Sequence, residues 1–154
     1  MKNSDTPRQF LIAQVSSRMI ALDVQQIVEI ISPGAGLGVD AMKRANKIQI
    51  RDISYNLVYP AEKLFGLPEA IPPSYRVLLL GPQDSGNALA VDSVESIIRV
   101  EPGDIQEYSG ISNGPAPEFV SGVIIQDEQA VYILKPEKFC RPRHKRKPVK
   151  SRAR

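Results

Sequence analysis

The sequence predicts an all-β protein made of one or two small barrels. About nine short apolar or alternating segments recur at a spacing of roughly ten residues, with turn-forming residues between them. Proline is abundant, at 13 of 154 residues or about 8%, where about 5% is usual. A chain of this length forms one domain, or two very small ones that share a core. We therefore expect many turns and edges and few long helices.

The first two predicted strands form a hairpin. They lie at residues 9–15 and 18–22 and are separated by Ser16-Ser17, a two-residue connection that suits a tight hairpin turn.

Residues 24–31 are predicted to form a short amphipathic helix. Val24, Ile27, Val28 and Ile31 recur at the spacing of one helix face. Asp23 stands before this face and Gln26 three residues later, a variant of the capping box. Pro33-Gly34 ends the segment.

The glycines that follow raise the question of a phosphate-binding loop. A dinucleotide loop needs a strand before the glycines and a helix after them, the reverse of the order predicted here. After Gly34 and Gly36 the motif also needs Gly or Ala at position 39, where Val39 stands, and no Gly-Lys-Ser/Thr follows as in a P-loop. We interpret the glycines as a flexible connector.

The rest of the chain is predicted to form strands and one further helix. Residues 47–52 alternate, with Ile48 and Ile50 on one face and Arg51 on the other. Pro60 begins a short helix that ends before Gly66. The remaining strands are expected at residues 53–59, 75–80, 87–91, 96–100, 118–125 and 130–134.

A faint internal repeat suggests two similar halves. "ALDVQQIVEIISP" from Ala21 aligns with "AVDSVESIIRVEP" from Ala90, an alignment that pairs Asp23 with Asp92. Asp92 could bind a ligand, but as the mirror of Asp23 it is expected to cap a turn. Each half is too small to be stable alone, so the two would share a core.

Charge divides the chain into a body and a tail. Residues 141–154 hold eight Lys or Arg and no acid, which leaves 12 basic and all 17 acidic residues in 1–140, a net charge of −5. The tail has almost nothing to bury and is predicted to be disordered. Its basic cluster includes Arg141, Arg143, Lys145, Arg146 and Lys147. The predicted division is a flexible N-terminus at 1–7, a domain at 8–140 and the basic tail.

No catalytic site is predicted. His144 is the only histidine and lies in the tail, where nothing would orient it as a base. Cys140 is the only cysteine, so it excludes an internal disulfide, has no second thiol for a metal site, and fits a reducing compartment. Basic neighbours could lower its thiol pKa and make it reactive. We expect a cytoplasmic protein with no cofactor, no metal and no small-molecule substrate.

Four blocks of sequence, in order, resemble the CheW-like domain family over roughly residues 8–139. They are "RMIALDVQQIVEII", "IQIRDISYNLVYPAEKLFGL", "RVLLL" with "ALAVDSVESIIRVEPGDI", and "EFVSGVIIQDEQAVYIL". The resemblance implies two intertwined five-stranded SH3-like β-barrels around a shared core, without a catalytic site. It also implies an adaptor of a bacterial chemosensory complex that couples the cytoplasmic tip of a chemoreceptor to the regulatory domain of a CheA-type histidine kinase. Contact with membrane arrays would then be peripheral, through the receptor.

The resemblance assigns partner binding to Arg51, Glu29, Ile27 and Asn46. Glu29 lies off the apolar face of its predicted helix, and Arg51 points away from the buried face of its strand, where its planar fork suits an interface. Asn46 and Asp52 stand where the family usually has glycine, and residues 57–61 depart from its P-V-x-D-L pattern. An alternative, non-flagellar chemosensory pathway would fit these departures.

A small barrel that binds nucleic acid through its basic tail is the alternative function. The sequence pI of about 9.1 favours it. The acidic body and the lack of an exposed aromatic and basic strand pattern speak against it. The tail could equally touch anionic lipid near a receptor.

Overall fold

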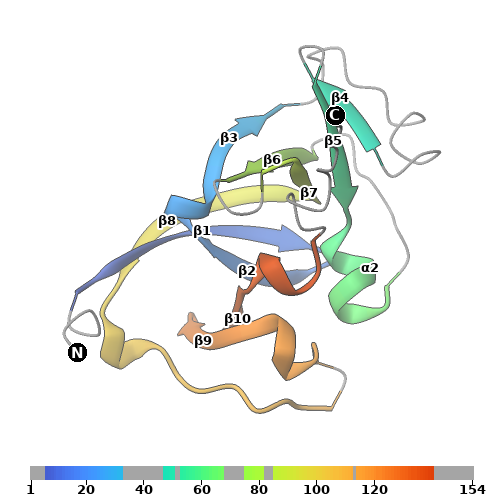
Figure 1. Cartoon of the computed structure of the whole chain (residues 1–154). Coiled ribbons are helices and arrows are strands. Elements are labelled where there is room, and N and C mark those ends of the chain that lie inside the picture. The colour runs from blue at the N-terminus through green and yellow to red at the C-terminus, as the bar shows by residue number, and fades with distance from the viewer. Residues whose placement is uncertain are drawn as a thin grey trace, which may run out of the picture.

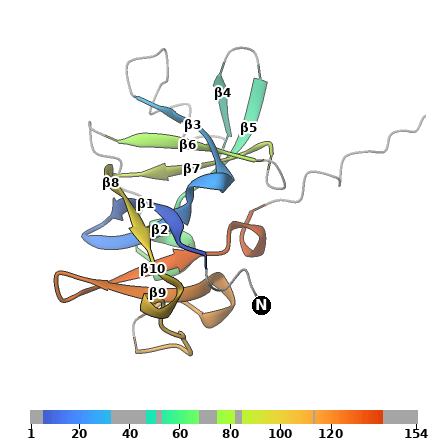
Figure 2. The same ribbon diagram turned by 90° about the vertical axis from the view of Figure 1, so that its left-hand side faces the viewer.

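The computed structural model describes residues 6–32, 47–50, 53–67, 75–81, 85–112 and 114–140, with only the backbone of Gln49. Ten strands form two five-stranded sheets, which lie one above the other in Figure 2. The first sheet has the order β8-β1-β2-β10-β9, and the second has the order β3-β6-β7-β5-β4. The predicted fold class, two five-stranded SH3-like barrels around a shared core, is confirmed.

The strands of the first sheet are β1 (Arg8–Val15), β2 (Arg18–Asp23), β8 (Ser93–Val100), β9 (Val120–Gln126) and β10 (Gln129–Leu134). Those of the second sheet are β3 (Ile27–Ile31), β4 (Lys47–Ile50), β5 (Ile53–Val58), β6 (Arg76–Leu80) and β7 (Asn87–Val91). The α-helix within the described residues, α2 (Pro60–Phe65), lies beside β5 (Figure 1). Short 3₁₀ turns are η2 (Val24–Gln26), η3 (Pro102–Asp104), η4 (Pro117–Phe119) and η5 (Pro136–Lys138).

The two halves of the chain exchange strands. β1 and β2 start the first sheet, but β3 crosses over and pairs with β6 in the second sheet. In the same way β7 is followed by β8, which returns to pair with β1. Each sheet also contains one parallel pair, β10 with β2 and β5 with β7. Neither half therefore contains all the strands of one sheet.

This exchange gives the internal repeat a structural counterpart. Reading the two sheets in order matches β1 with β6, β2 with β7, β3 with β8, β4 with β9 and β5 with β10. The start of β2 at Arg18 and the start of β7 at Asn87 are separated by the same offset as Asp23 and Asp92 in the sequence repeat. The two aspartates thus fall at equivalent points, at the end of the second strand of one half and directly after that of the other.

One core joins the two sheets. Its fully buried side chains include Leu11 and Ile20 from the first sheet and Leu78 and Leu89 from the second. α2 adds Leu64 to the same cluster. Burial of such a side chain is worth about 1.5–3 kcal/mol. Each half therefore depends on the other for a complete core, as the small size of each half predicts.

The predicted hairpin at Ser16-Ser17 is confirmed. Both serines have positive φ, 50° and 64°, and Asp127 and Glu128 repeat this geometry between β9 and β10 with 53° and 65°. Positive φ at both central residues is the type I′ turn, whose twist matches that of the flanking strands. The two tight hairpins set the registers of β1 with β2 and of β9 with β10.

The predicted helix over residues 24–31 is wrong. Only η2 is helical, and residues 27–31 form strand β3, which pairs with β6 through Glu29–Leu79 and Ile31–Val77. The run Ile27-Val28-Glu29-Ile30-Ile31 is rich in β-branched side chains, which favour a strand. A bulge at Val28 also disturbs the alternation that would have marked the strand in the sequence.

This correction changes the argument about the glycine connector. A strand, not a helix, precedes the glycines, so the order of elements no longer speaks against a dinucleotide loop. Val39 in place of the third glycine still does. The connector itself lies outside the described residues.

The helix predicted at Pro60 is confirmed as α2. It begins with Pro60, and Gly66 ends it with φ of 67°, in the left-handed region that suits glycine. Phe65 at its end links the helix to the first sheet, because its ring lies 5.9 Å from that of Tyr132 and 5.0 Å from the guanidinium carbon of Arg18. α2 is thereby held against both sheets.

Candidate partner-binding surface

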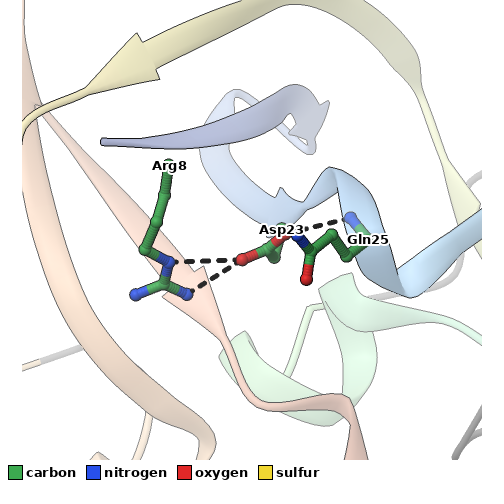
Figure 3. Close-up of polar contacts among 3 residues, drawn as sticks. All are labelled: Arg8, Asp23 and Gln25. Carbon is green, nitrogen blue, oxygen red and sulfur yellow. Dashed lines mark hydrogen bonds and ion pairs between the residues drawn. The ribbon is translucent and has the colours of Figure 1, made fainter. Parts of the chain in front are cut away.

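The passage from β2 to β3 is held by a network around Asp23 (Figure 3). One carboxylate oxygen of Asp23 accepts a hydrogen bond from the backbone N–H of Gln25 at 2.9 Å and caps η2. The other accepts from the guanidinium of Arg8 at 3.1 Å. Arg8 also lies over the ring of Phe10, 4.8 Å from its centroid. These contacts fix the direction in which the chain enters β3.

β3 is one of the two edge strands of the second sheet and exposes apolar side chains. Val28 is 69% exposed and Ile30 41%, while Ile31 is buried. Within the described part of the chain, β3 pairs only with β6. An edge strand with exposed apolar side chains can bind a partner through both its backbone and its side chains.

Gly81, which follows β6, lets the chain pass close to β3. Its backbone N–H donates to the carbonyl of Gln26 at 3.1 Å. A Cβ at Gly81 would lie 2.8 Å from a methyl group of Val28, closer than carbon atoms approach in proteins. Glycine at position 81 therefore allows the backbone after β6 to pack closely against Val28 of β3.

The loop between η3 and η4 carries a second exposed apolar side chain. Ile111 is 61% exposed. The hydroxyl of Tyr108 donates to the carbonyl of Pro115 at 2.6 Å, and the N–H of Gly114 donates to the carbonyl of Ile111 at 3.1 Å. Burial, and secondarily the neighbouring Tyr132, raise the pKa of Tyr108, while a backbone hydrogen bond lowers it. The neutral hydroxyl thus braces a loop that presents Ile111 to solvent.

Most of the exposed large apolar side chains in the described part of the chain lie on edge strands. Besides Ile111 and Ile53 they are Val28 and Ile30 on β3, Ile97 on β8 and Ile125 on β9. β3 ends the second sheet, and β8 and β9 are the two ends of the first. Single exposed apolar residues are ordinary, but their concentration on edges favours docking of other proteins over binding of a small molecule.

The structure places some of the predicted partner-binding residues. Ile27 is half-buried and packs against the shared core. Glu29 is half-buried, between exposed Val28 and Ile30. Asn46, Arg51 and the basic tail lie outside the described residues. Ile48 and Ile50 are 5% and 6% exposed, so the predicted buried face of this strand is confirmed. The outward orientation of Arg51 was inferred from that face and stays a prediction, because the described strand ends at Ile50.

Sequence reasoning missed Val28 and Ile30 as exposed residues. The helical pattern assigned Val28 to a buried face, whereas in the strand it occupies a bulge and faces solvent. The signal that could have found them is the β-branched composition of residues 27–31, which favours a strand over a short helix.

Asp92 caps a turn, as predicted, but a distant one. Its carboxylate accepts a hydrogen bond from the backbone N–H of Ser16 in the first hairpin turn at 2.9 Å. Among the residues that the structure describes, no three His, Cys, Asp or Glu side chains gather as a metal site would require. In the same residues no helix is long and apolar enough to cross a membrane.

Two exchanged SH3-like barrels with apolar side chains on their edges define a paired-barrel β domain. The chain belongs to the CheW-like domain family, whose model matches residues 9–142. Its fold is similar to that of the scaffolding protein TtCheW from Thermoanaerobacter tengcongensis, with a TM-score of 0.69 and 14% sequence identity. That match covers 84% of this chain and 85% of the other. A search of curated proteins gave no match. The family resemblance read from the four sequence blocks is confirmed.

Proposed function

We propose that this protein is a non-catalytic adaptor of a chemosensory complex. It would hold the cytoplasmic tip of a chemoreceptor to the regulatory domain of a histidine kinase. The observation that carries the proposal is the family match over residues 9–142 together with the paired-barrel fold. The scaffolding description of the structurally similar TtCheW supports the same role.

Two separate apolar surfaces suit an adaptor, which needs one site for each partner. The first is the β3 edge, with Val28 and Ile30, beside the proposed partner residues Glu29 and Ile27. The second is the Ile111 loop, which belongs to the connection between β8 and β9 of the other sheet. Exposed apolar residues on rigid supports are the usual anchors of protein interfaces.

We also propose that the partners belong to an alternative, non-flagellar chemosensory pathway. Support comes from the departures at Asn46 and Asp52 and from the segment 57–61, where the family pattern is replaced. In this segment Tyr59 is buried and Pro60 begins α2. The departure from the family pattern therefore affects buried positions at the junction of β5 and α2.

Co-purification tests the proposal. The tagged full chain is used as bait in an extract of its source cells, and a chemoreceptor and a histidine kinase are expected among the bound proteins. Ile30→Glu and Ile111→Glu should each remove one of these partners and keep the other, so that each variant is the control for the other. Circular dichroism checks that both remain folded. Retention of both partners by both variants, or the absence of receptor and kinase, would contradict the proposal.

Nucleic-acid binding is separated from this role by a filter-binding assay. The described residues carry 12 acidic and eight basic side chains, so binding of RNA or DNA would have to come from the basic tail. A full chain that retains nucleic acid on the filter at physiological salt, and binds no receptor or kinase, would favour the alternative function.

A further inference from the structure

A groove lies between the two edge strands of the first sheet. Strands β8 and β9 and the segment from Gly103 to Gln106 line it, and its volume is about 400 Å³. Ile98, Val100 and Ile124 supply apolar lining, and Ile125 adds a side chain that is 51% exposed. The described residues place no strand between β8 and β9. Gln106 bridges β9 at Val123, with backbone hydrogen bonds of 2.8 and 2.9 Å. The outer edge of β8 has no strand partner among the described residues, so this β8–β9 groove offers apolar surface and one open strand edge to an extended segment.

The surroundings of the β8–β9 groove are acidic. Asp104 lines it, and Asp127 and Glu128 follow directly on its lining residue Gln126. Asp104, Asp127 and Glu128 are all exposed. Among the described lining residues, Arg99 is the one basic side chain. An occupant that complements this charge is basic.

The chain itself carries such a segment within reach. The described chain ends beside the start of β9, because the rings of Phe139 and Phe119 lie 5.8 Å apart. From Val120 to Ile125 the strand spans five residues, about 17 Å. Pro148 lies eight residues beyond Cys140, an extended reach of about 26 Å. The tail is therefore long enough to reach the groove.

We infer that the basic tail folds back onto its own body and lies in the β8–β9 groove. The apolar pair Pro148-Val149 contacts the groove lining, while Lys147 and Lys150 on either side face the acidic rim around Asp104 and Asp127. An extended segment in a groove needs no core of its own, which agrees with the composition of the tail. Docking would also withhold its basic side chains from nucleic acid and anionic lipid.

Carbodiimide cross-linking of the full chain tests this contact, because the reagent joins a lysine amine to a carboxylate only when the two touch. Mass spectrometry should find Lys147 or Lys150 joined to Asp104, Asp127 or Glu128. Val149→Asp should lower the yield of these products about tenfold, because a charged group cannot replace the apolar contact. Ala153→Asp introduces the same charge four residues away and should change the yield far less.

Three outcomes would overturn the inference. Cross-links spread evenly over exposed acids elsewhere, such as Glu62 and Glu95, would show only diffuse attraction. An equal effect of Val149→Asp and Ala153→Asp would show that charge alone holds the tail. In a mixture of ¹⁵N-labelled and unlabelled chains, products that join one label type to the other would place the tail in the groove of a second copy.

Discussion

The carboxylate of Asp92 accepts a hydrogen bond from the backbone N–H of Ser16, 76 residues earlier in the chain, at 2.9 Å. The N–H of Asp92 in turn donates to the carbonyl of Gln14 at 2.8 Å. Asp92 follows β7 of the second sheet, and Ser16 begins the tight turn between β1 and β2 of the first. This pair therefore fastens one sheet to the other at the point where the second half of the chain crosses back.

Asp92→Ala should destabilise the fold by about 1–2 kcal/mol, because the half-buried N–H of Ser16 loses its acceptor. Asp92→Asn keeps an acceptor oxygen and should cost less. Urea unfolding measures both, with Glu107→Ala, the loss of an exposed acid, as the control. If Asp92→Ala unfolds at the same urea concentration as the wild type, the contact does not hold the turn.

Gly122→Ala should destabilise the protein by about 1–3 kcal/mol, the usual range for overpacking. A Cβ at Gly122 would lie 2.6 Å from a methyl group of Ile105 and 3.1 Å from the carbonyl oxygen of Gln106. Ile105→Ala in the same chain should recover part of the loss, which thermal unfolding of the double variant would show. Gly103→Ala is the control, since a Cβ there meets nothing within 4 Å. Equal effects of the two glycine changes would contradict the packing argument.

Stability should fall at alkaline pH, partly through Tyr108. Burial raises the pKa of Tyr108, and burial alone raises that of Tyr75, so both side chains are held neutral in the fold. The two neutral tyrosines contribute fully to the free energy of unfolding below a pH of about 10, the pKa of tyrosine in the unfolded chain. This contribution is lost as the pH rises through the higher pKa that the tyrosines have in the folded protein.

Tyr108→Phe should cost about 1 kcal/mol at neutral pH through the lost hydrogen bond to Pro115. It should also reduce the loss of stability between about pH 9 and 12. Urea unfolding across this range, with tyrosinate absorbance as the second readout, measures both effects. An unchanged alkaline slope in the variant would show that Tyr108 does not titrate in the fold.

Arg51→Glu should leave the fold intact and abolish binding of one partner. A surface substitution changes the free energy of unfolding by about 0.5 kcal/mol. Loss of a hydrogen-bonded charge pair at an interface costs about 2–5 kcal/mol, more than tenfold in affinity. Isothermal titration of a purified partner and urea unfolding of the variant measure the two quantities. Glu29→Lys should behave in the same way.

Lys63→Glu is the matched control for Arg51→Glu, since it reverses an exposed charge on α2, which lies apart from β3 and β4 (Figure 1). Unfolding by Arg51→Glu would show that the residue is structural. Wild-type affinity of Arg51→Glu for every partner would remove Arg51 from the proposed interface.

Several elements could be predicted because their signals are local. The turn at Ser16-Ser17, the start of α2 at Pro60 and its end at Gly66 follow from backbone preferences of a few adjacent residues. The buried face with Ile48 and Ile50 follows from alternation along one strand. The family blocks extended these local patterns to the whole domain. The partner residue Arg51 comes from the family resemblance and stays a prediction.

What the sequence by itself determined is most of the strands, the internal repeat that pairs Asp23 with Asp92, and the need for a shared core. Tertiary structure alone decided which strands pair, because pairing partners lie far apart along the chain and leave no local signal. Residues 27–31 show this most clearly. Their apolar spacing is compatible with a helix, and pairing with β6, together with a bulge at Val28, makes them a strand. The same pairing turned Val28 outward, and the return of the chain after β7 brought Asp92 to Ser16, so the partner surface and the fastening of the two sheets both follow from long-range contacts.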